Sequence, residues 1–158
     1  LGGILGFPTY DERIRDAFEH AQKMGVAYNY IIDEETVTNH PNTADIDIVG
    51  ITGRQMSIRG ESIGGGKMKI VRIDGIDVEF TGEYSTLIVK QLDKPGVVAH
   101  ITQALSEQNV NIAFMRVFRE AKGHTAYTIV ESDGKLPEDI AAELSENENI
   151  IDVMIVQV

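Results

Sequence analysis

Two polar stretches in the second half of the chain have residue types suited to holding a small ligand. They are residues 92–98, Leu-Asp-Lys-Pro-Gly-Val-Val, and residues 109–112, Asn-Val-Asn-Ile. The first is typical of a strand end followed by a glycine turn that opens a helix, and the second of the entry to another strand. Backbone N–H groups at the start of a helix attract a carboxylate or a phosphate. These stretches therefore predict a small-ligand sensor rather than a catalyst.

A second polar group surrounds a proline in the first half. His40, Asn42 and Thr43 lie directly before a predicted strand, and each side chain can donate or accept a hydrogen bond. A polar cluster at the entrance of a strand often belongs to a functional site. The alternative is an ordinary turn with His40 in solvent.

A third group is built on glycine. Ser62 lies just before a run of three glycines, which are Gly64, Gly65 and Gly66, and Lys67 follows. Because glycine adopts positive φ readily, the anionic group of a ligand could approach the main chain here. The alternative is a flexible hairpin loop between two strands.

The elements expected in the first half are one amphipathic helix and an antiparallel sheet on which it packs. The helix starts at a capping box formed by Thr9 and Glu12 and ends at Gly25. Strands are expected at residues 27–32, 46–51, 56–63, 67–73 and 76–80. Asp74-Gly75 is a strong signal for a two-residue hairpin turn. A short polar joint ends at residue 85, and we place a boundary there between domains 1–85 and 86–158.

The second half is expected to fold as a ferredoxin-like βαββαβ unit, which makes the whole chain an α+β protein. Its elements are strand 86–91, helix 96–108, strands 111–119 and 124–131, a helix with Pro137 in its first turn, and strand 150–158. Both faces of strand 111–119 are apolar. We therefore expect a partner domain or subunit to cover the face of the sheet that the helices leave open.

Composition limits the classes of function. The chain has 158 residues, no cysteine and a net charge of −11. The absence of cysteine excludes disulfides and any thiolate-ligated cluster held by this chain alone. The acidity, which is spread over both halves, argues against nucleic acid as a partner. No apolar stretch is long enough to span a membrane.

The second half resembles the ACT regulatory domain, in which an amino acid commonly binds between paired domains. The matching residues are Asp93-Lys94-Pro95-Gly96 and Val110-Asn111-Ile112. Similarity to the serine-sensing ACT domain of phosphoglycerate dehydrogenase implies effector contacts at Gln91, Asp93, Gly96 and Asn111. That enzyme has His in place of Gln91 and Asn in place of Asp93, which leaves the identity of the effector open. The resemblance implies a small amino acid, with L-serine first, and a homodimer formed through the ACT domain.

The whole chain is similar to the β chain of bacterial iron–sulfur L-serine dehydratase. The motifs are Leu-Gly-Phe with Asp-Glu-Arg-Ile, then His-Pro-Asn-Thr-Ala, then Ser-Ile-Gly-Gly-Gly with a following Lys. In that family the first half is an allosteric substrate-binding domain. The family's upstream Ser-Ser-Ser-His-Thr and Gly-His-Gly-Thr-Asp segments are missing. Since the chain also begins without Met, we expect a truncated, partial first domain that is inactive alone.

The resemblance implies a split enzyme that converts L-serine to pyruvate and ammonia, in the cytoplasm and in gluconeogenesis. A cysteine-bearing α subunit would carry a [4Fe–4S] cluster, and this chain would bind no cofactor. His40, Asn42, Thr43, Ser62, Gly64, Gly65 and Gly66 would then lie near the substrate carboxylate or at the α-chain contact. No catalytic base is assigned to this chain. The alternatives are an amino-acid-sensing module of another enzyme, such as phosphoglycerate dehydrogenase, and a purely structural dimerisation protein.

Overall fold

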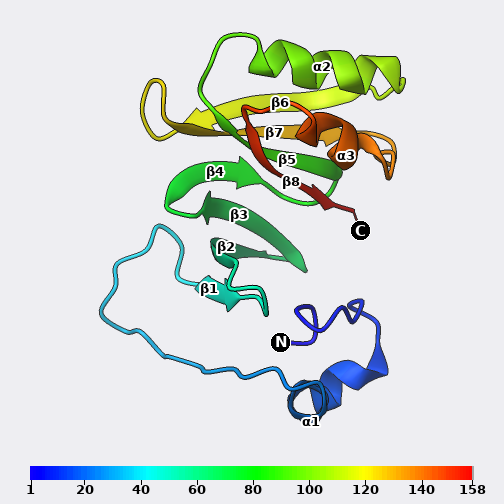
Figure 1. The fold of residues 1–158 in the computed structure, drawn as a ribbon. Coiled ribbons are helices and arrows are strands. Elements are labelled where there is room, and N and C mark those ends of the chain that lie inside the picture. Colours follow the sequence, from blue (N-terminus) through cyan, green and yellow to red (C-terminus); the bar gives the residue numbers. More distant parts are fainter. Residues whose placement is uncertain (158) are drawn as a thin grey trace. The chain divides into compact units, whose positions relative to one another are not determined.

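The computed structural model describes residues 1–157, and its backbone contacts form two compact units, Leu1–Val37 and the part that begins at Thr38 (Figure 1). The last residue of the predicted strand 150–158 lies outside the described residues. Within residues 1–157 no helix is long and apolar enough to cross a membrane. The α+β class expected from the sequence is confirmed.

The first unit holds a shorter helix than the sequence predicts. A 3-10 turn, η1 (Glu12–Asp16), leads into α1 (Ala17–Lys23). The predicted capping box is wrong, because Asp11 caps this turn by accepting a hydrogen bond from the backbone N–H of Arg13 at 2.9 Å. Gly25 follows the helix with φ of +70°, so its predicted end is confirmed.

The predicted strand at residues 27–32 is also wrong. This segment has no strand partner among the described residues. Tyr28 and Tyr30 instead form an aromatic cluster with Phe18, with ring centroids 5.4 to 6.0 Å apart. Aromatic and β-branched composition favours a strand only where another strand supplies the hydrogen bonds.

The second unit begins with a four-stranded antiparallel sheet whose strands lie in chain order. The strands are β1 (Thr43–Val49), β2 (Gln55–Gly64), β3 (Lys67–Ile73) and β4 (Ile76–Phe80). They correspond to the predicted strands with small shifts at the ends. The turn between β3 and β4 has φ of +48° at Asp74 and +83° at Gly75, which confirms the predicted hairpin turn.

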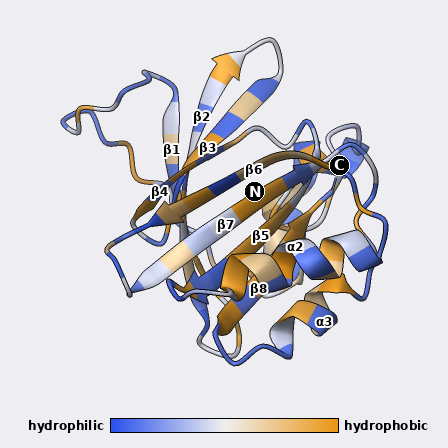
Figure 2. Cartoon of the chain, turned by 90° about the horizontal axis from the view of Figure 1, so that it is seen from above, coloured by the Kyte–Doolittle hydropathy of each residue, from blue (hydrophilic) through white to orange (hydrophobic). Residues whose placement is uncertain are grey.

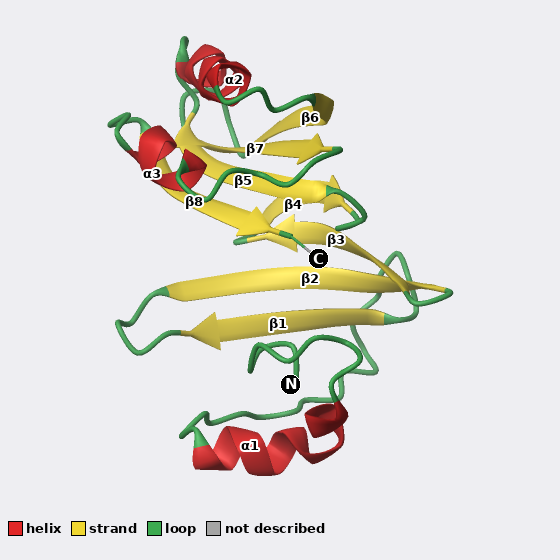
Figure 3. Cartoon of the chain, turned by 90° about the vertical axis from the view of Figure 1, so that its right-hand side faces the viewer, coloured by secondary structure: helices red, strands yellow, loops and turns green. Residues whose placement is uncertain are grey.

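The second sheet is the expected βαββαβ unit. Its elements are β5 (Ser85–Leu92), α2 (Val97–Glu107), β6 (Ile112–Arg119), β7 (Thr125–Ser132), α3 (Ile140–Ser145) and β8 (Ile150–Val156). The strand order β6-β7-β5-β8 is antiparallel throughout, and both helices lie on one face (Figure 3). This confirms the ferredoxin-like topology. Figure 2 shows apolar residues concentrated on β5 and β8 and on parts of both helices.

Helix α2 has ends that its own sequence specifies. Gly96 starts it in the left-handed conformation at φ of +89°. At the other end Asn109 is left-handed, with φ of +56°, and donates its N–H to the carbonyl of Ser106, while Val110 donates to the carbonyl of Leu105. This pair of bonds is a Schellman motif with Asn in the position that glycine usually takes. The helix therefore buries Ile101 and Leu105 in a fixed register against the sheet.

The other face of the second sheet packs on the first sheet. Ile73, Ile76, Val78 and Phe80 of β3 and β4 form one apolar core with Ile88, Tyr127 and Ile129 of β5 and β7. Phe118 of β6 packs against this core, so the first sheet covers this part of the face that the helices leave open. Residues 81–84 link the two sheets, and the domain boundary at residue 85 stays a prediction.

Asp74 forms the polar centre of the contact between the sheets. Its carboxylate accepts hydrogen bonds from the Tyr127 hydroxyl at 2.9 Å, from the Lys90 ammonium at 2.8 Å and from the backbone N–H of Ser57 at 3.0 Å. Partial burial raises the pKa of Asp74, but these donors outweigh it and leave the pKa below its ordinary value of 3.8. Burial and the bond to Asp74 raise the pKa of Tyr127.

Replacing Asp74 with Asn tests this centre. Asn tolerates the left-handed turn conformation, so the substitution removes the charge and keeps the hairpin. We expect a loss of about 1–2 kcal/mol in the free energy of unfolding at pH 7, because hydrogen bonds to a charged acceptor are lost. Urea unfolding monitored by circular dichroism measures this difference.

The pH dependence gives a second readout of the same variant. A carboxyl whose pKa is lowered by folding stabilises the fold above its unfolded pKa, and this contribution is lost as pH falls through the folded pKa. The gap between the two proteins should therefore close below pH 3.8. The control is Asp77→Asn, which breaks an exposed pair with Arg72 and should cost less than about 1 kcal/mol. An equal loss in both variants would contradict the role of Asp74.

Candidate functional site

The pairing of β1 with β2 brings two of the predicted groups together. Thr43 lies opposite Glu61, and the backbone N–H of Ser62 donates to the carbonyl of Asn42 at 2.9 Å. The turn from His40 to Thr43 and the start of the glycine run therefore share one end of the first sheet. Their closeness follows from strand register, although about 20 residues separate them in the chain.

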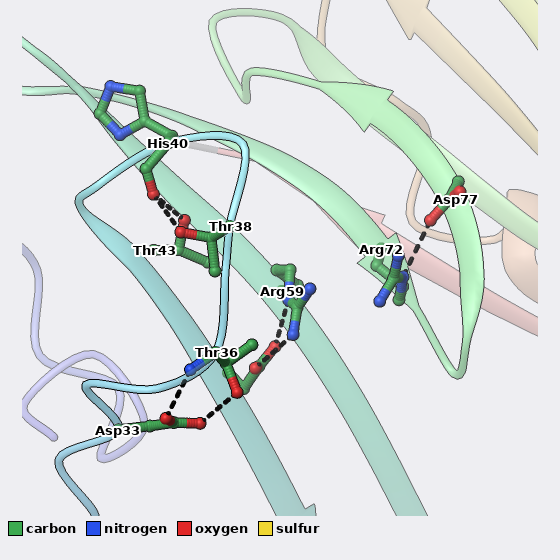
Figure 4. A network of polar contacts seen from close by, with 9 residues as sticks. Asp33, Thr36, Thr38, His40, Thr43, Arg59, Arg72 and Asp77 are labelled. Carbon is green, nitrogen blue, oxygen red and sulfur yellow. Dashed lines mark hydrogen bonds and ion pairs between the residues drawn. The ribbon is translucent and has the colours of Figure 1, made fainter.

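The His40 turn is held by its own polar groups. The carbonyl of His40 accepts from the Thr38 hydroxyl at 2.7 Å and from the Thr43 hydroxyl at 2.6 Å (Figure 4). The backbone N–H of Asn42 donates to Nδ1 of the imidazole at 3.2 Å. Since Nδ1 accepts, the proton of the neutral ring lies on Nε2. His40 thus presents Nε2–H as a donor.

The three glycines form a tight hairpin turn between β2 and β3. Gly64 pairs with Lys67, and the φ angles of Gly64, Gly65 and Gly66 are +87°, +62° and +76°. A Cβ at any of them would meet no atom within 4 Å. The positive φ angles, rather than a lack of space, are what require glycine here.

A polar cavity of about 470 Å³ opens beside the His40 turn. The residues that line it are Thr38, Asn39, His40, Arg59, Glu61, Ile63, Lys69, Val71, Arg72, Asp77, Val78 and Glu79. Of the predicted site residues only His40 is among them, whereas Asn42, Thr43, Ser62 and the glycines lie outside this lining. Sequence reasoning missed Arg59, Glu61 and Arg72. Their signal was the charged residues that alternate with apolar ones along β2 and β3.

The charges of this cavity are balanced. Arg59 makes a two-point bond with Asp45 at 2.7 Å, Arg72 pairs with Asp77 at 2.8 Å, and Lys69 lies 3.6 Å from Glu61. The bond to Asp45 raises the pKa of Arg59. Glu61 is only 7% exposed, although its ion pair is long. Such a lining suits a small zwitterion better than a multiply charged anion.

The predicted effector residues lie at two opposite ends of the second sheet. Gln91 is buried, and its Oε1 accepts from the Thr128 hydroxyl at 3.1 Å. Gly96 opens α2, which has no side-chain cap on its first N–H groups. Gln91, Asp93 and Gly96 share one end of β5. Asn111 lies at the other end, where its Nδ2 donates to Asp133 at 3.1 Å.

Strand register gives the separation. Ile112 and Ser85 both face Ser132 at one end, while Leu92 faces Thr125 at the other. Seven residues of strand span roughly 23 Å. One chain therefore does not bring Asn111 together with the other three residues.

Asp93 already has partners within the chain. Its Oδ2 accepts from the backbone N–H of Gly123 at 2.9 Å and from Arg119 at 3.3 Å, and its own N–H donates to the carbonyl of His124 at 2.7 Å. The bond from Gly123 lowers the pKa of Asp93, and Arg119 adds to this against partial burial. Asp93 thus ties the turn before α2 to the hairpin between β6 and β7.

Comparison with known proteins gives matches over both halves. The ACT domain family matches residues 85–149. A probable L-serine dehydratase β chain of Bacillus subtilis is 35% identical over 153 residues, which cover 97% of this chain and 69% of that one. The L-serine dehydratase β chain of Peptoniphilus asaccharolyticus is 34% identical over 144 residues, 91% of this chain and 65% of that one.

A third relative matches only part of this chain. D-3-phosphoglycerate dehydrogenase of Methanocaldococcus jannaschii is 31% identical over 103 residues, 65% of this chain and 20% of that enzyme. The match to the two β chains extends over nearly the whole sequence, including the turn with His40 and the glycine hairpin. On this evidence the chain belongs to the family of L-serine dehydratase β chains, and its second half is an ACT domain.

Proposed function

We propose that this chain is the β subunit of an L-serine dehydratase and supports the deamination of L-serine to pyruvate and ammonia together with an α subunit. The observation that carries the proposal is the charge-balanced cavity of about 470 Å³ beside the His40 turn, in a chain of this family. L-Serine is a small zwitterion, and the cavity offers cations for its carboxylate and Glu61 for its ammonium group.

The residues of this chain supply binding and orientation rather than a metal centre. With no cysteine, the chain lacks the thiolates that hold an iron–sulfur cluster, so a cluster would belong to a cysteine-bearing α subunit. His40 is one of the residues that line the cavity, and its Nε2–H would donate to the substrate or to the α subunit. Ser62 and the glycine turn lie at the same end of the sheet and would form the rest of the α-chain contact.

Replacing His40 with Ala tests this role. We expect kcat/KM for serine deamination to fall about 10- to 100-fold in the complex with the α subunit, because one orienting contact is lost. The assay follows pyruvate formation under anaerobic conditions with the β chain in excess. A gel-filtration measurement of complex formation separates loss of substrate contact from loss of the α subunit.

The matched control is His124→Gln. The side chain of His124 is exposed on the hairpin between β6 and β7, far along the chain from the cavity, and activity should stay within about twofold. Equal activity of the His40 variant and the parent would contradict the proposed role of the His40 turn.

We also infer that the effector residues unite across a homodimer. In the order β6-β7-β5-β8, β6 is an edge strand, with Phe114 and Val117 exposed by 48% and 44%. Antiparallel pairing of two β6 edges about a two-fold axis would place the start of one beside the end of the other. Asn111 of one copy would then approach the end of the partner copy that holds Asp93 and Gly96. A small amino acid could bind there, with its carboxylate at the first turn of α2.

Replacing Val117 with Lys tests this pairing. Charged residues on an edge strand oppose strand addition, so we expect the parent to sediment at twice its 17.4 kDa mass and the variant as a monomer. Amide shifts that L-serine induces at Gly96 and Asn111 in the parent should disappear with the dimer.

The matched control places the same charge on the other edge. Ile151 of β8 is 52% exposed, and Ile151→Lys should stay dimeric. A monomer with Ile151→Lys and a dimer with Val117→Lys would assign the interface to β8 and refute this arrangement.

A second candidate is an amino-acid-sensing module of another enzyme, which the match to the Methanocaldococcus jannaschii dehydrogenase favours. The two functions differ in their partner. Co-expression with a cysteine-rich α chain should give a stable complex under the first proposal, whereas the second requires a nucleotide-binding catalytic partner.

A further inference from the structure

A second, smaller cavity of about 170 Å³ lies between the two sheets. The residues that line it are Lys69, Glu79, Phe80, Thr81, Tyr84, Phe114, Arg116 and Glu131. It is reached from the face of the ACT sheet opposite the helices, since Arg116 bridges to β4 there. It therefore differs from the effector position at the start of α2.

Glu131 is the unusual member of this lining. It is 7% exposed, and its side chain forms no hydrogen bond or ion pair with any other residue in the range 1–157. The register places it opposite Phe114 on one side and Thr86 on the other. The Thr86 hydroxyl donates instead to the carbonyl of Tyr84. The enclosed side-chain atom that lacks a hydrogen-bond partner within residues 1–157 is Nε2 of His100, so the carboxylate oxygens of Glu131 keep contact with solvent. Since Glu131 lines the cavity, a cation or a donor can reach its carboxylate there.

Arg116 supplies the opposite charge, and some of its N–H donors are not used by other residues of the described chain. Its Nη1 donates to the carbonyl and to Oε1 of Glu79, at 3.2 and 3.0 Å. Within the described part of the chain its Nε and Nη2 have no acceptor. The guanidinium carries five donors in a planar fork that matches a carboxylate. The cavity thus has one wall for an ammonium group and one for a carboxylate.

The aromatic lining and the volume of the cavity limit the size of a ligand. Tyr84 and Phe114 pack edge to face with centroids 5.5 Å apart, and the buried Phe80 also lines the cavity. A cavity of about 150 Å³ can hold benzene, which has six heavy atoms. A cavity of similar volume matches glycine, alanine and serine, which have about five to seven heavy atoms.

We propose that this cavity binds a small α-amino acid, with its ammonium group on Glu131, its carboxylate on Arg116 and its short side chain against Phe114 and Tyr84. The site is separate from the proposed serine-deamination cavity and from the proposed effector position. It is contained in one chain, so it does not depend on the dimer.

The test follows amide shifts of the 158-residue chain at Thr81, Tyr84, Arg116 and Glu131 during titration with glycine, alanine and serine. Methylammonium and glycolate each retain one charged half of glycine. We expect saturable shifts with the amino acids, and at least about tenfold weaker binding of methylammonium and of glycolate. No shift at these four residues would overturn the proposal, and so would equal affinity for methylammonium, which would make the site a simple cation site.

Two variants separate the roles. Glu131→Gln, which is nearly isosteric, should weaken glycine by at least about tenfold, whereas Arg116→Gln should weaken glycine and leave methylammonium unchanged. The control is the exposed Glu120→Gln, which should bind as the parent does. If Glu131→Gln does not fold, the Arg116 comparison still decides. Unchanged glycine affinity in a folded variant of either residue would refute the assignment.

Discussion

The apolar contact between the β3–β4 hairpin and the sheet face opposite α2 and α3 is the constraint on which the second unit depends. Strand β5 is buried on both faces, because Leu87 and Val89 pack on the helices while Ile88 packs on the hairpin. This explains its continuous apolar sequence. Without the hairpin, Ile88, Tyr127 and Ile129 would face water. The two sheets therefore belong to one compact unit that begins at Thr38.

The same contact creates the smaller cavity, whereas the larger cavity is lined by the first sheet and by residues 38–40 before it. Lys69 and Glu79 belong to the linings of both, and their partners Glu61 and Arg116 lie on opposite sides of the boundary between the sheets. Arg116 finds its partner Glu79 across the boundary, whereas Lys69 pairs with Glu61 within the first sheet. Glu131 lines the smaller cavity without a hydrogen-bond or ion-pair partner in residues 1–157, and this is more informative about ligands than another satisfied ion pair.

Local signals in the sequence were sufficient for turns and for helix ends, and non-local pairing was not predictable from them. The residue types of Asp74, Gly75 and Gly25 favour the positive φ angles that these residues adopt. The prediction of a strand at residues 27–32 was wrong because no strand within residues 1–157 pairs with this segment. Glu131 is the one charged residue of β7 and lies next to its end, so its residue type favours a solvated position. The available signal was that successive side chains of a strand point to opposite faces. This places Glu131 on the same face as Tyr127 and Ile129.

The geometry of the ACT half changes what its signature residues do. Asp93 is satisfied by Gly123 and Arg119 and fixes the turn, so its charge does not decide which ligand binds. The uncapped N–H groups at the start of α2 remain the feature that favours an anion. Since Asn111 lies roughly 23 Å of strand away from them, a site that uses both must be intermolecular. Two-fold symmetry would then create two equal sites, and binding at them would depend on the concentration of the chain itself.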